Sequence, residues 1–290
     1  MPLDIWNQEL WAAGIERAIL QEAVYITPDV CNRDYEGEIQ GVGSSVKIRV
    51  VNAPTISTYD DTTGLSAAER IDPNLLHLVI NQQKSFNFEL TSIQKMQTGL
   101  PDAFIKDQTA EAGKAMADVM DQYMASLLTD VSSTNVIGTA SSAKVPTSAD
   151  MYDYLINLLV LLDNARAPKR DRFFVIPPVC HALLLRDARF IATGTPKGDT
   201  AMQTGEVGMI SNAKVFVSTN VPNAGSGTYY QICAGTKRAW AFVDELTETE
   251  VYKPPLQFST AVKGLEVYGG KVVRPDWLAK AYMTPALPTA

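Results

Sequence analysis

The chain has 290 residues, of which 46% are hydrophobic and 20% are charged, as in a folded globular protein with a sizeable core. Its formal net charge of −7 opposes broad attachment to nucleic-acid phosphates or anionic lipid, so neither is expected as a specific ligand. No apolar run approaches the roughly 18 residues of a membrane span, and the N-terminal residues lack a signal-peptide pattern.

The first twenty residues carry large apolar side chains at helical spacing, among them Trp6 and Trp11. Chain ends fray unless something holds them. Two tryptophans this close to an end therefore predict that it docks, either on this chain or on a neighbouring one.

The next part of the chain predicts strands around a long polar connection. Val46, Ile48 and Val50 alternate with polar residues, which indicates a strand with one apolar face. Residues 55–73 are polar and too many for a tight turn. The apolar run LLHLVI then resumes the strand pattern, and SFNFEL alternates after it. A hairpin of this length is marginally stable alone, so we expect it to lie on another surface.

The longest helix signal in the sequence covers residues 101–131. It begins with a proline, contains strong helix formers, and would span about 45 Å. The expected buried face consists of residues three or four positions apart: Ala112, Met116, Val119, Met120, Tyr123, Leu127 and Val131. Asp118 and Asp121 are placed on the polar side.

After a connector at residues 132–148, a leucine stripe predicts a second helix over 151–162, and FFVI predicts a short buried strand at 173–176. Residues 189–208 form a polar loop long enough to be a binding element or an ordinary solvated loop. The remaining residues to Met283 predict a series of strands. The expected breaks are Gly235, Asp244, Pro254, Pro255, Gly269, Gly270 and Pro275.

No catalytic, cofactor-binding or metal-ligating residues are predicted. Cys31, Cys180 and Cys233 are far apart and are expected to be buried free thiols. His77 is expected on a strand face, and neither it nor His181 has a nucleophile motif nearby. The sequence therefore does not indicate an enzyme.

Several runs of residues resemble the major capsid proteins of tailed bacteriophages with the HK97-type fold. These runs are NRDYEGEIQGVGSSVKIRVVNAPTISTYD, LVINQQKSFNFELTSIQKMQTG, the long helix, AGTKRAWAFVDELTETEVYKPP and VKGLEVYGGKVVRPDWLAKAYM. The order of the elements carries the resemblance, which covers nearly the whole chain.

The resemblance implies an α+β fold of the HK97 type. Its parts would be an N-terminal arm at 1–36, an extended β-hairpin called the E-loop at 37–85, and a peripheral (P) domain at 86–147 with a spine helix at 101–131. An axial (A) domain at 148–240 and C-terminal strands at 241–290, returning through both domains, would complete it. The implied function is self-assembly into the icosahedral or prolate head shell around the double-stranded DNA of a tailed phage.

The resemblance also implies partners. We expect hexamers and pentamers of this chain, a portal protein at one vertex, non-specific contact with packaged DNA, and in some heads a decoration protein. A separate scaffolding protein is expected because the sequence begins almost at the arm. No cofactor is expected. The expected location is the virion, after assembly in the bacterial cytoplasm.

The candidate inter-subunit contacts follow from this expectation. The arm would contribute Trp6 and Trp11, and the hairpin would contribute its apolar positions, although these could equally form a core within one chain. Arg49, Glu69 and Arg70 are candidates for ion pairs, each worth under about 1 kcal/mol. The hairpin positions are Val46, Ile48, Val50, Leu76, Leu78 and Ile80.

The sequence leaves three alternatives to this interpretation. Autocatalytic cross-links between subunits, known in some members of the family, are not expected, because Lys47 lies low on the first strand and residues 55–72 contain no lysine. An encapsulin-type compartment shares the fold, but the long hairpin argues against it. An unrecognised enzyme or binding module is the third alternative.

Overall fold

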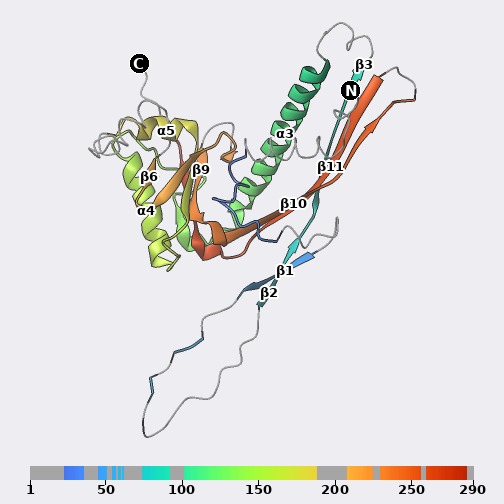
Figure 1. Ribbon diagram of the computed structural model, residues 1–290. Helices are drawn as coiled ribbons and strands as arrows, with labels where there is room; N and C mark the ends of the chain where they lie inside the picture. The colour runs from blue at the N-terminus through green and yellow to red at the C-terminus, as the bar shows by residue number, and fades with distance from the viewer. Residues whose placement is uncertain are drawn as a thin grey trace.

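The computed structural model describes residues 23–35, 45–50, 54–56, 58–59, 61, 74–91, 101–187, 208–224, 229–255 and 259–285. Figure 1 shows a long helix lying along extended strands, a compact region with two shorter helices beside it, and a hairpin that points away from both. Most strand pairs in the two larger sheets are antiparallel and the helices lie beside the sheets, so the fold is α+β, as predicted. Within these residues no helix is both long and apolar enough to cross a membrane.

The helices of the described chain are α3 (Pro101–Ser126), α4 (Met151–Asn164) and α5 (Pro178–Leu184), with 3₁₀ turns η3 (Leu127–Asp130), η4 (Ser133–Asn135), η5 (Lys237–Ala239) and η6 (Pro275–Trp277). The first strands are β1 (Ser45–Val50), β2 (Asn74–Val79), β3 (Gln82–Thr91), β4 (Val136–Ile137), β5 (Arg172–Ile176) and β6 (Met209–Ile210). The later strands are β7 (Ala213–Val217), β8 (Asn223–Ala224), β9 (Tyr229–Thr236), β10 (Trp240–Tyr252), β11 (Ser259–Val272) and β12 (Leu278–Met283).

Helix α3 begins at the predicted proline but ends at Ser126, five residues before the predicted end, where a 3₁₀ turn takes over. Met116 and Met120 are buried as predicted. Two other predictions for this helix were wrong: Val119 is 37% exposed, and Asp121, placed on the polar side, is only 1% exposed. The buried face is rotated toward Asp121 because an N-terminal segment of the chain covers that side.

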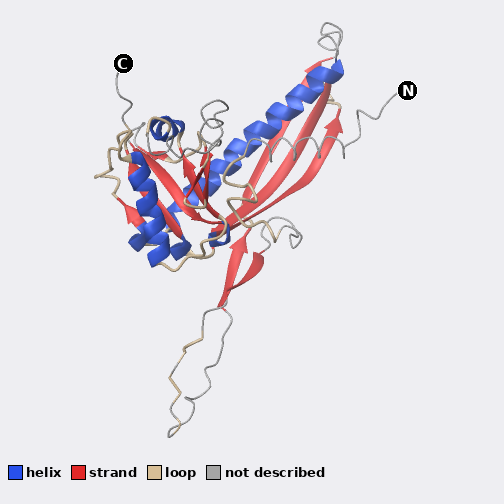
Figure 2. Cartoon of the chain, turned by 60° about the vertical axis from the view of Figure 1, so that its left-hand side comes forward, coloured by secondary structure: helices blue, strands red, loops and turns tan. Residues whose placement is uncertain are grey.

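Three long antiparallel strands in the order β10-β11-β3 form the sheet along which α3 lies (Figures 1 and 2). The predicted breaks at Asp244, Gly269 and Gly270 were wrong, since β10 and β11 run through all three. The Asp244 carboxylate is paired with Arg33, which makes it tolerable in a strand. A Cβ at Gly269 would lie 2.6 Å from the Val79 carbonyl oxygen, so the glycine there permits a close approach and does not end the strand.

A seven-stranded sheet in the order β4-β12-β9-β5-β7-β6, with β8 also paired to β9, forms the compact region. Every residue of β5 is buried, since both faces of the sheet are covered. Phe174 and Ile176 pack in a cluster with α4 and α5, including the predicted leucine stripe. Phe173 and Val175 face a second cluster, which contains Trp240 and the methionines of α3. That second cluster joins the compact region to the long sheet.

Candidate functional site

Strands β1 and β2 form a separate two-stranded antiparallel sheet, in which Val46 lies opposite Leu78 and Ile48 opposite Leu76. This sheet is attached to the long sheet by buried side chains. Val46, Ile48, Leu78 and Ile80 share a hydrophobic cluster with Ala241, Val243 and Val267 of β10 and β11. Lys271 adds a hydrogen bond from its Nζ to the His77 carbonyl oxygen, at 3.0 Å. The base of the hairpin is therefore fixed to its own chain.

The six predicted hairpin positions divide by burial. Val46 and Ile48 are 2% exposed, while Leu78 and Ile80 are fully buried. Val50 and Leu76 are partly buried and pack against the same cluster. The structure thus brings all six together at the base of the hairpin, and their contact with a neighbouring chain stays a prediction.

The opposite face of the same two strands is exposed. We call this surface the outer hairpin face, and it consists of Ser45, Lys47, Leu75, His77 and Val79. Leu75 is 49% and Val79 47% exposed. These two apolar residues are not among the predicted contacts, because LLHLVI is apolar at successive positions and alternation does not distinguish its two faces. His77 does lie on a strand face, as predicted.

Two further apolar side chains are exposed in the connection between β1 and β2. Ile56 is 95% and Tyr59 is 62% exposed, more than any other large hydrophobic residue of the described chain. Both lie between β1 and β2 in the sequence, and the described part of the chain covers little of either side chain. Together with the outer hairpin face, they make this part of the chain suited to contact a second surface.

The N-terminal segment at residues 23–35, which we call the anchor segment, is held by α3. Asp121 accepts hydrogen bonds from three consecutive backbone N–H groups, those of Val24, Tyr25 and Ile26, at 2.8, 3.0 and 3.3 Å. Its carboxylate thus satisfies the donors of a turn that no strand pairs. The residues joined are almost a hundred positions apart in the sequence.

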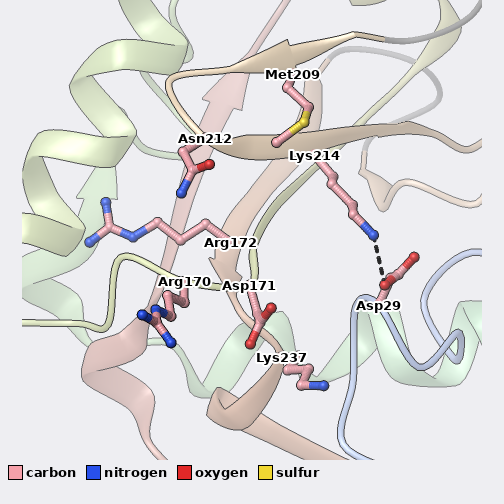
Figure 3. Close-up of a pocket in the computed structure, with 8 residues that line it drawn as sticks. All are labelled: Asp29, Arg170, Asp171, Arg172, Met209, Asn212, Lys214 and Lys237. Atoms are coloured by element: carbon pink, nitrogen blue, oxygen red, sulfur yellow. Dashed lines mark ion pairs between the residues drawn. The ribbon is translucent and has the colours of Figure 1, made fainter.

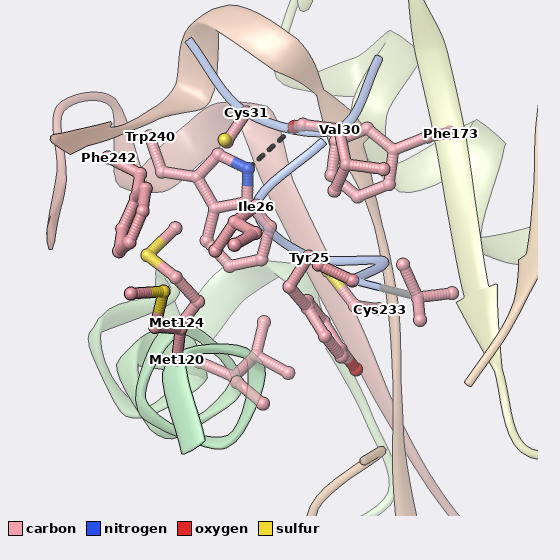
Figure 4. Packing of buried hydrophobic residues seen from close by; sticks show 14 of the residues in the cluster. Tyr25, Ile26, Val30, Cys31, Met120, Met124, Phe173, Cys233, Trp240 and Phe242 are labelled. Atoms are coloured by element: carbon pink, nitrogen blue, oxygen red, sulfur yellow. Dashed lines mark hydrogen bonds between the residues drawn. The ribbon is translucent and has the colours of Figure 1, made fainter. Parts of the chain in front are cut away.

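The anchor segment is also held by β10. The Trp240 indole Nε1–H donates to the Val30 carbonyl oxygen at 2.7 Å, deep in the cluster (Figure 4). Backbone hydrogen bonds join Asn32 to Trp240 and Phe242 on either side. The Tyr25 ring meets the Trp240 ring edge to face, with centroids 6.0 Å apart. Residues 23–35 therefore dock on their own chain.

Burial dominates the electrostatics of this docking site. It raises the pKa of Asp121 from 3.8 to about 6, although the three backbone hydrogen bonds oppose the shift. Burial likewise raises the pKa of Tyr25 well above 10.0, with smaller contributions from Cys233 and Asp121. At the other end of the segment, Arg33 forms an ion pair with Asp244 at 2.5 Å.

Several predicted contact residues lie outside the described part of the chain: Trp6, Trp11, Glu69 and Arg70. Arg49 is described only by its backbone, which pairs with Leu75 in the hairpin. Most of the polar loop at 189–208 also lies outside the described residues.

The three cysteines are buried free thiols, as predicted. Burial raises the pKa of Cys180 to about 12, so this thiol is a poor nucleophile at neutral pH. Among the residues that the structure describes, no three His, Cys, Asp or Glu side chains are grouped as metal ligands.

A pocket of about 230 Å³ lies where the anchor segment meets the compact region (Figure 3). We call it the basic pocket, because four of its side chains are cationic and two are anionic. The charged residues that line it are Asp29, Arg170, Asp171, Arg172, Lys214 and Lys237. Its cations come from three separate stretches of the chain, so no run of charges in the sequence reveals it.

A family model described as "Phage capsid protein" matches residues 80–281 of the chain. No protein in the search of curated sequences matches it. The family match covers most of the chain and includes both of the larger sheets.

Three solved structures illustrate the structural likeness. A structure of Mycobacterium phage Che8 shares 26% identity over 89% of this chain and 90% of its own, with a TM-score of 0.68. The capsid of Ralstonia phage GP4 has a TM-score of 0.67 at 13% identity, over 93% and 89% of the two chains. The SrpI encapsulin of Synechococcus elongatus PCC 7942 has a TM-score of 0.52 at 14% identity, over 82% and 81%. The last two likenesses concern the fold alone, and the fold alone does not separate capsids from encapsulins.

Proposed function

This chain belongs to the phage capsid protein family and is a major capsid protein of the phage head shell, and we propose that its β1–β2 hairpin joins neighbouring subunits of that shell. The family is a structural one without enzymatic activity, and its members are components of the virion. The work of such a protein is therefore to bury surface on its neighbours.

The observation that carries the proposal is the two-faced hairpin. One face is fixed to the same chain by Val46, Ile48, Leu78 and Ile80. The outer face presents Leu75 and Val79, each about half exposed, and the connection presents Ile56 and Tyr59. A rigid base holds these apolar groups away from the body, so a neighbour can bury them without any rearrangement of the hairpin base. Burial of each would gain about 1 to 2 kcal/mol.

Closed symmetric shells need contacts of this kind. Rings and closed surfaces are built from heterologous interfaces, in which a patch on one subunit meets a different patch on the next. A projecting hairpin and a receiving surface on the neighbour form such a pair. Many weak contacts then stabilise a shell whose single interfaces are modest.

The parts of the fold are assigned accordingly. The hairpin at 37–85 serves as the E-loop, α3 as the spine helix of a P domain at 86–147, and the seven-stranded sheet with α4 and α5 as most of an A domain at 148–240. The arm at 1–36 contributes Trp6 and Trp11, and residues 241–290 return through both domains. The family's arrangement supports these assignments, and Arg49, Glu69 and Arg70 are retained as candidate ion-pair residues.

The proposed assembly consists of hexamers and pentamers of this chain around double-stranded DNA, with a portal protein at one vertex. A separate scaffolding protein directs closure, and a decoration protein is a further candidate partner. Electron microscopy of the chain expressed alone, and coexpressed with a scaffolding protein, tests the proposal. Closed particles or capsomer rings are expected, whereas a monodisperse monomer under both conditions would contradict it.

A paired substitution tests the hairpin itself. Leu75→Ser with Val79→Ser removes apolar groups that the single chain leaves exposed, so the subunit should unfold at the wild-type urea concentration while particle yield falls at least tenfold. Val160→Ser is the matched control, because Val160 is 47% exposed on α4. Wild-type particle yield from the hairpin variant would show that the outer hairpin face makes no shell contact.

A further inference from the structure

The basic pocket is lined by four parts of the chain. Asp29 comes from the anchor segment, Arg170 to Arg172 from the residues that lead into β5, Lys214 from β7, and Lys237 from η5. We propose that this pocket binds a carboxylate side chain of a second copy of the chain, an inference that rests on the proposed shell function.

Two of the four cations are already used within the subunit. Arg172 is buried and donates to Asp163, at 2.6 Å, and to the carbonyl oxygens of Ala167 and Pro168, at 2.9 and 2.8 Å. Lys214 forms an ion pair with Asp29 at 2.9 Å (Figure 3). These contacts hold two of the lining side chains in place and compensate the charge of both within the subunit.

The other two cations remain available. In the described part of the chain, neither Arg170 nor Lys237 has a side-chain hydrogen bond or an ion pair. Arg170 is exposed and Lys237 is partly buried. A guanidinium and an ammonium at one pocket are suited to a carboxylate, which the guanidinium can bind through two parallel hydrogen bonds.

The walls are held in uncommon backbone conformations. Asp171 has a φ of 55° and Asn212 a φ of 69°, which places two non-glycine residues of the lining in the left-handed region. Residues other than glycine are uncommon in this backbone conformation, and Asp and Asn are among those that adopt it most readily. The Asn212 amide Nδ2–H donates to the Lys169 carbonyl oxygen at 3.4 Å, which ties one wall to the other. The pocket is thus a built feature of the fold.

The charge of the chain favours a second copy as the partner. Each copy carries 32 acidic and 25 basic residues, so close packing of copies sets like charges against one another. A pocket with two unpaired cations gives a neighbour's acidic side chain an attractive place to lie. A DNA backbone fits less well, because the pocket of about 230 Å³ is narrow and Asp29 and Asp171 lie in its lining.

Zero-length cross-linking identifies the partner directly. Particles assembled from equal parts of ¹⁴N- and ¹⁵N-labelled subunits are treated with a carbodiimide, which joins a lysine amine to a carboxylate in contact with it. We expect peptides in which Lys237 is linked to an acidic residue carrying the other label, and we expect none in unassembled subunits. The Lys214–Asp29 link serves as the internal control, since it forms within one chain. If that link forms and Lys237 gives no mixed-label link, the proposal is wrong.

A charge reversal provides the second test. Lys237→Glu should lower particle yield at least tenfold and leave the thermal unfolding of the free subunit unchanged. Arg238→Glu is the matched control, because Arg238 is the exposed neighbour of Lys237 and does not line the pocket. Wild-type particle yield from Lys237→Glu would overturn the proposal. If those particles also retained less DNA, the pocket would be assigned to nucleic acid. Failure of the wild-type chain to assemble, both alone and with a scaffolding protein, would instead contradict the proposed function.

Discussion

Replacing Asp121 with asparagine should change how the stability of the subunit depends on pH. The Asp121 carboxylate is buried, has no cationic partner among the described residues, and accepts hydrogen bonds from the backbone of Val24, Tyr25 and Ile26. Burial raises its pKa from 3.8 to about 6. Asparagine keeps the shape of the side chain but does not titrate, so the substitution isolates the effect of the charge.

The sign and size of the effect follow from the two pKa values. Between pH 3.8 and about 6, the folded chain holds a proton on Asp121 that the unfolded chain has lost. The stabilisation of the folded state by this extra proton is therefore complete below pH 3.8 and is lost as pH rises through about 6. At about 1.4 kcal/mol per pH unit, the free energy of unfolding should fall by about 3 kcal/mol over this range through Asp121 alone.

Urea unfolding of unassembled subunits at several pH values between 4 and 7 measures this dependence. The free energy of unfolding of the wild type minus that of Asp121→Asn should fall by about 2.4 kcal/mol between pH 4 and pH 7, because part of the full effect of about 3 kcal/mol lies below pH 4. Asp118→Asn is the control, because Asp118 lies on the same helix but is exposed, and its carboxylate accepts a hydrogen bond from the Asn220 amide at 3.0 Å. A difference that stays constant across the pH range would refute the reasoning.

Three further predictions concern packing. Trp240→Phe removes the indole N–H that donates to the Val30 carbonyl oxygen and should lower the free energy of unfolding in urea by about 1–3 kcal/mol. Trp277 is partly buried, and an equal loss from Trp277→Phe would contradict this explanation. Gly269→Ala places a Cβ against the Val79 carbonyl oxygen and should lower the free energy of unfolding by about 1–3 kcal/mol. The atoms nearest to a Cβ at Gly264 belong to the Phe86 ring, a side chain that can move more easily than the Val79 backbone, so a larger loss from Gly264→Ala than from Gly269→Ala would count against the explanation. Leu78→Ala should cost about 2–5 kcal/mol, because Leu78 is fully buried. Leu75→Ala, at the half-exposed position on the other face, should cost under about 1 kcal/mol, and similar values for the two would mean that the faces are assigned wrongly.

Local signals predicted most of the helices and strands. The proline at position 101 and the helix formers after it predicted α3, the leucine stripe predicted α4, and the alternation at residues 46–50 predicted β1. These signals are reliable because helical capping and periodicity act between residues a few positions apart. The run FFVI predicted a buried strand for the same reason, and β5 is buried throughout.

The errors fall where distant residues meet. Asp121 was placed on the polar side of its helix because carboxylates usually face water, and the segment that buries it lies almost a hundred residues earlier. Gly269, Gly270 and Asp244 were read as strand breaks because those residues disfavour strands. The glycines instead admit Val79 and Met124 at close range, and Asp244 pairs with Arg33. Each exception depends on a partner far away in the sequence.

By itself, the sequence determined the class of the protein, the order of its elements and the absence of any enzyme motif, since composition, periodicity and capping are local properties. Only the tertiary structure decided which face of LLHLVI is exposed, what covers Asp121, and that Arg170 and Lys237 reach one pocket from positions 67 residues apart. A run that is apolar on both sides can be buried by either face, and a pocket is formed by distances that no spacing in the sequence encodes.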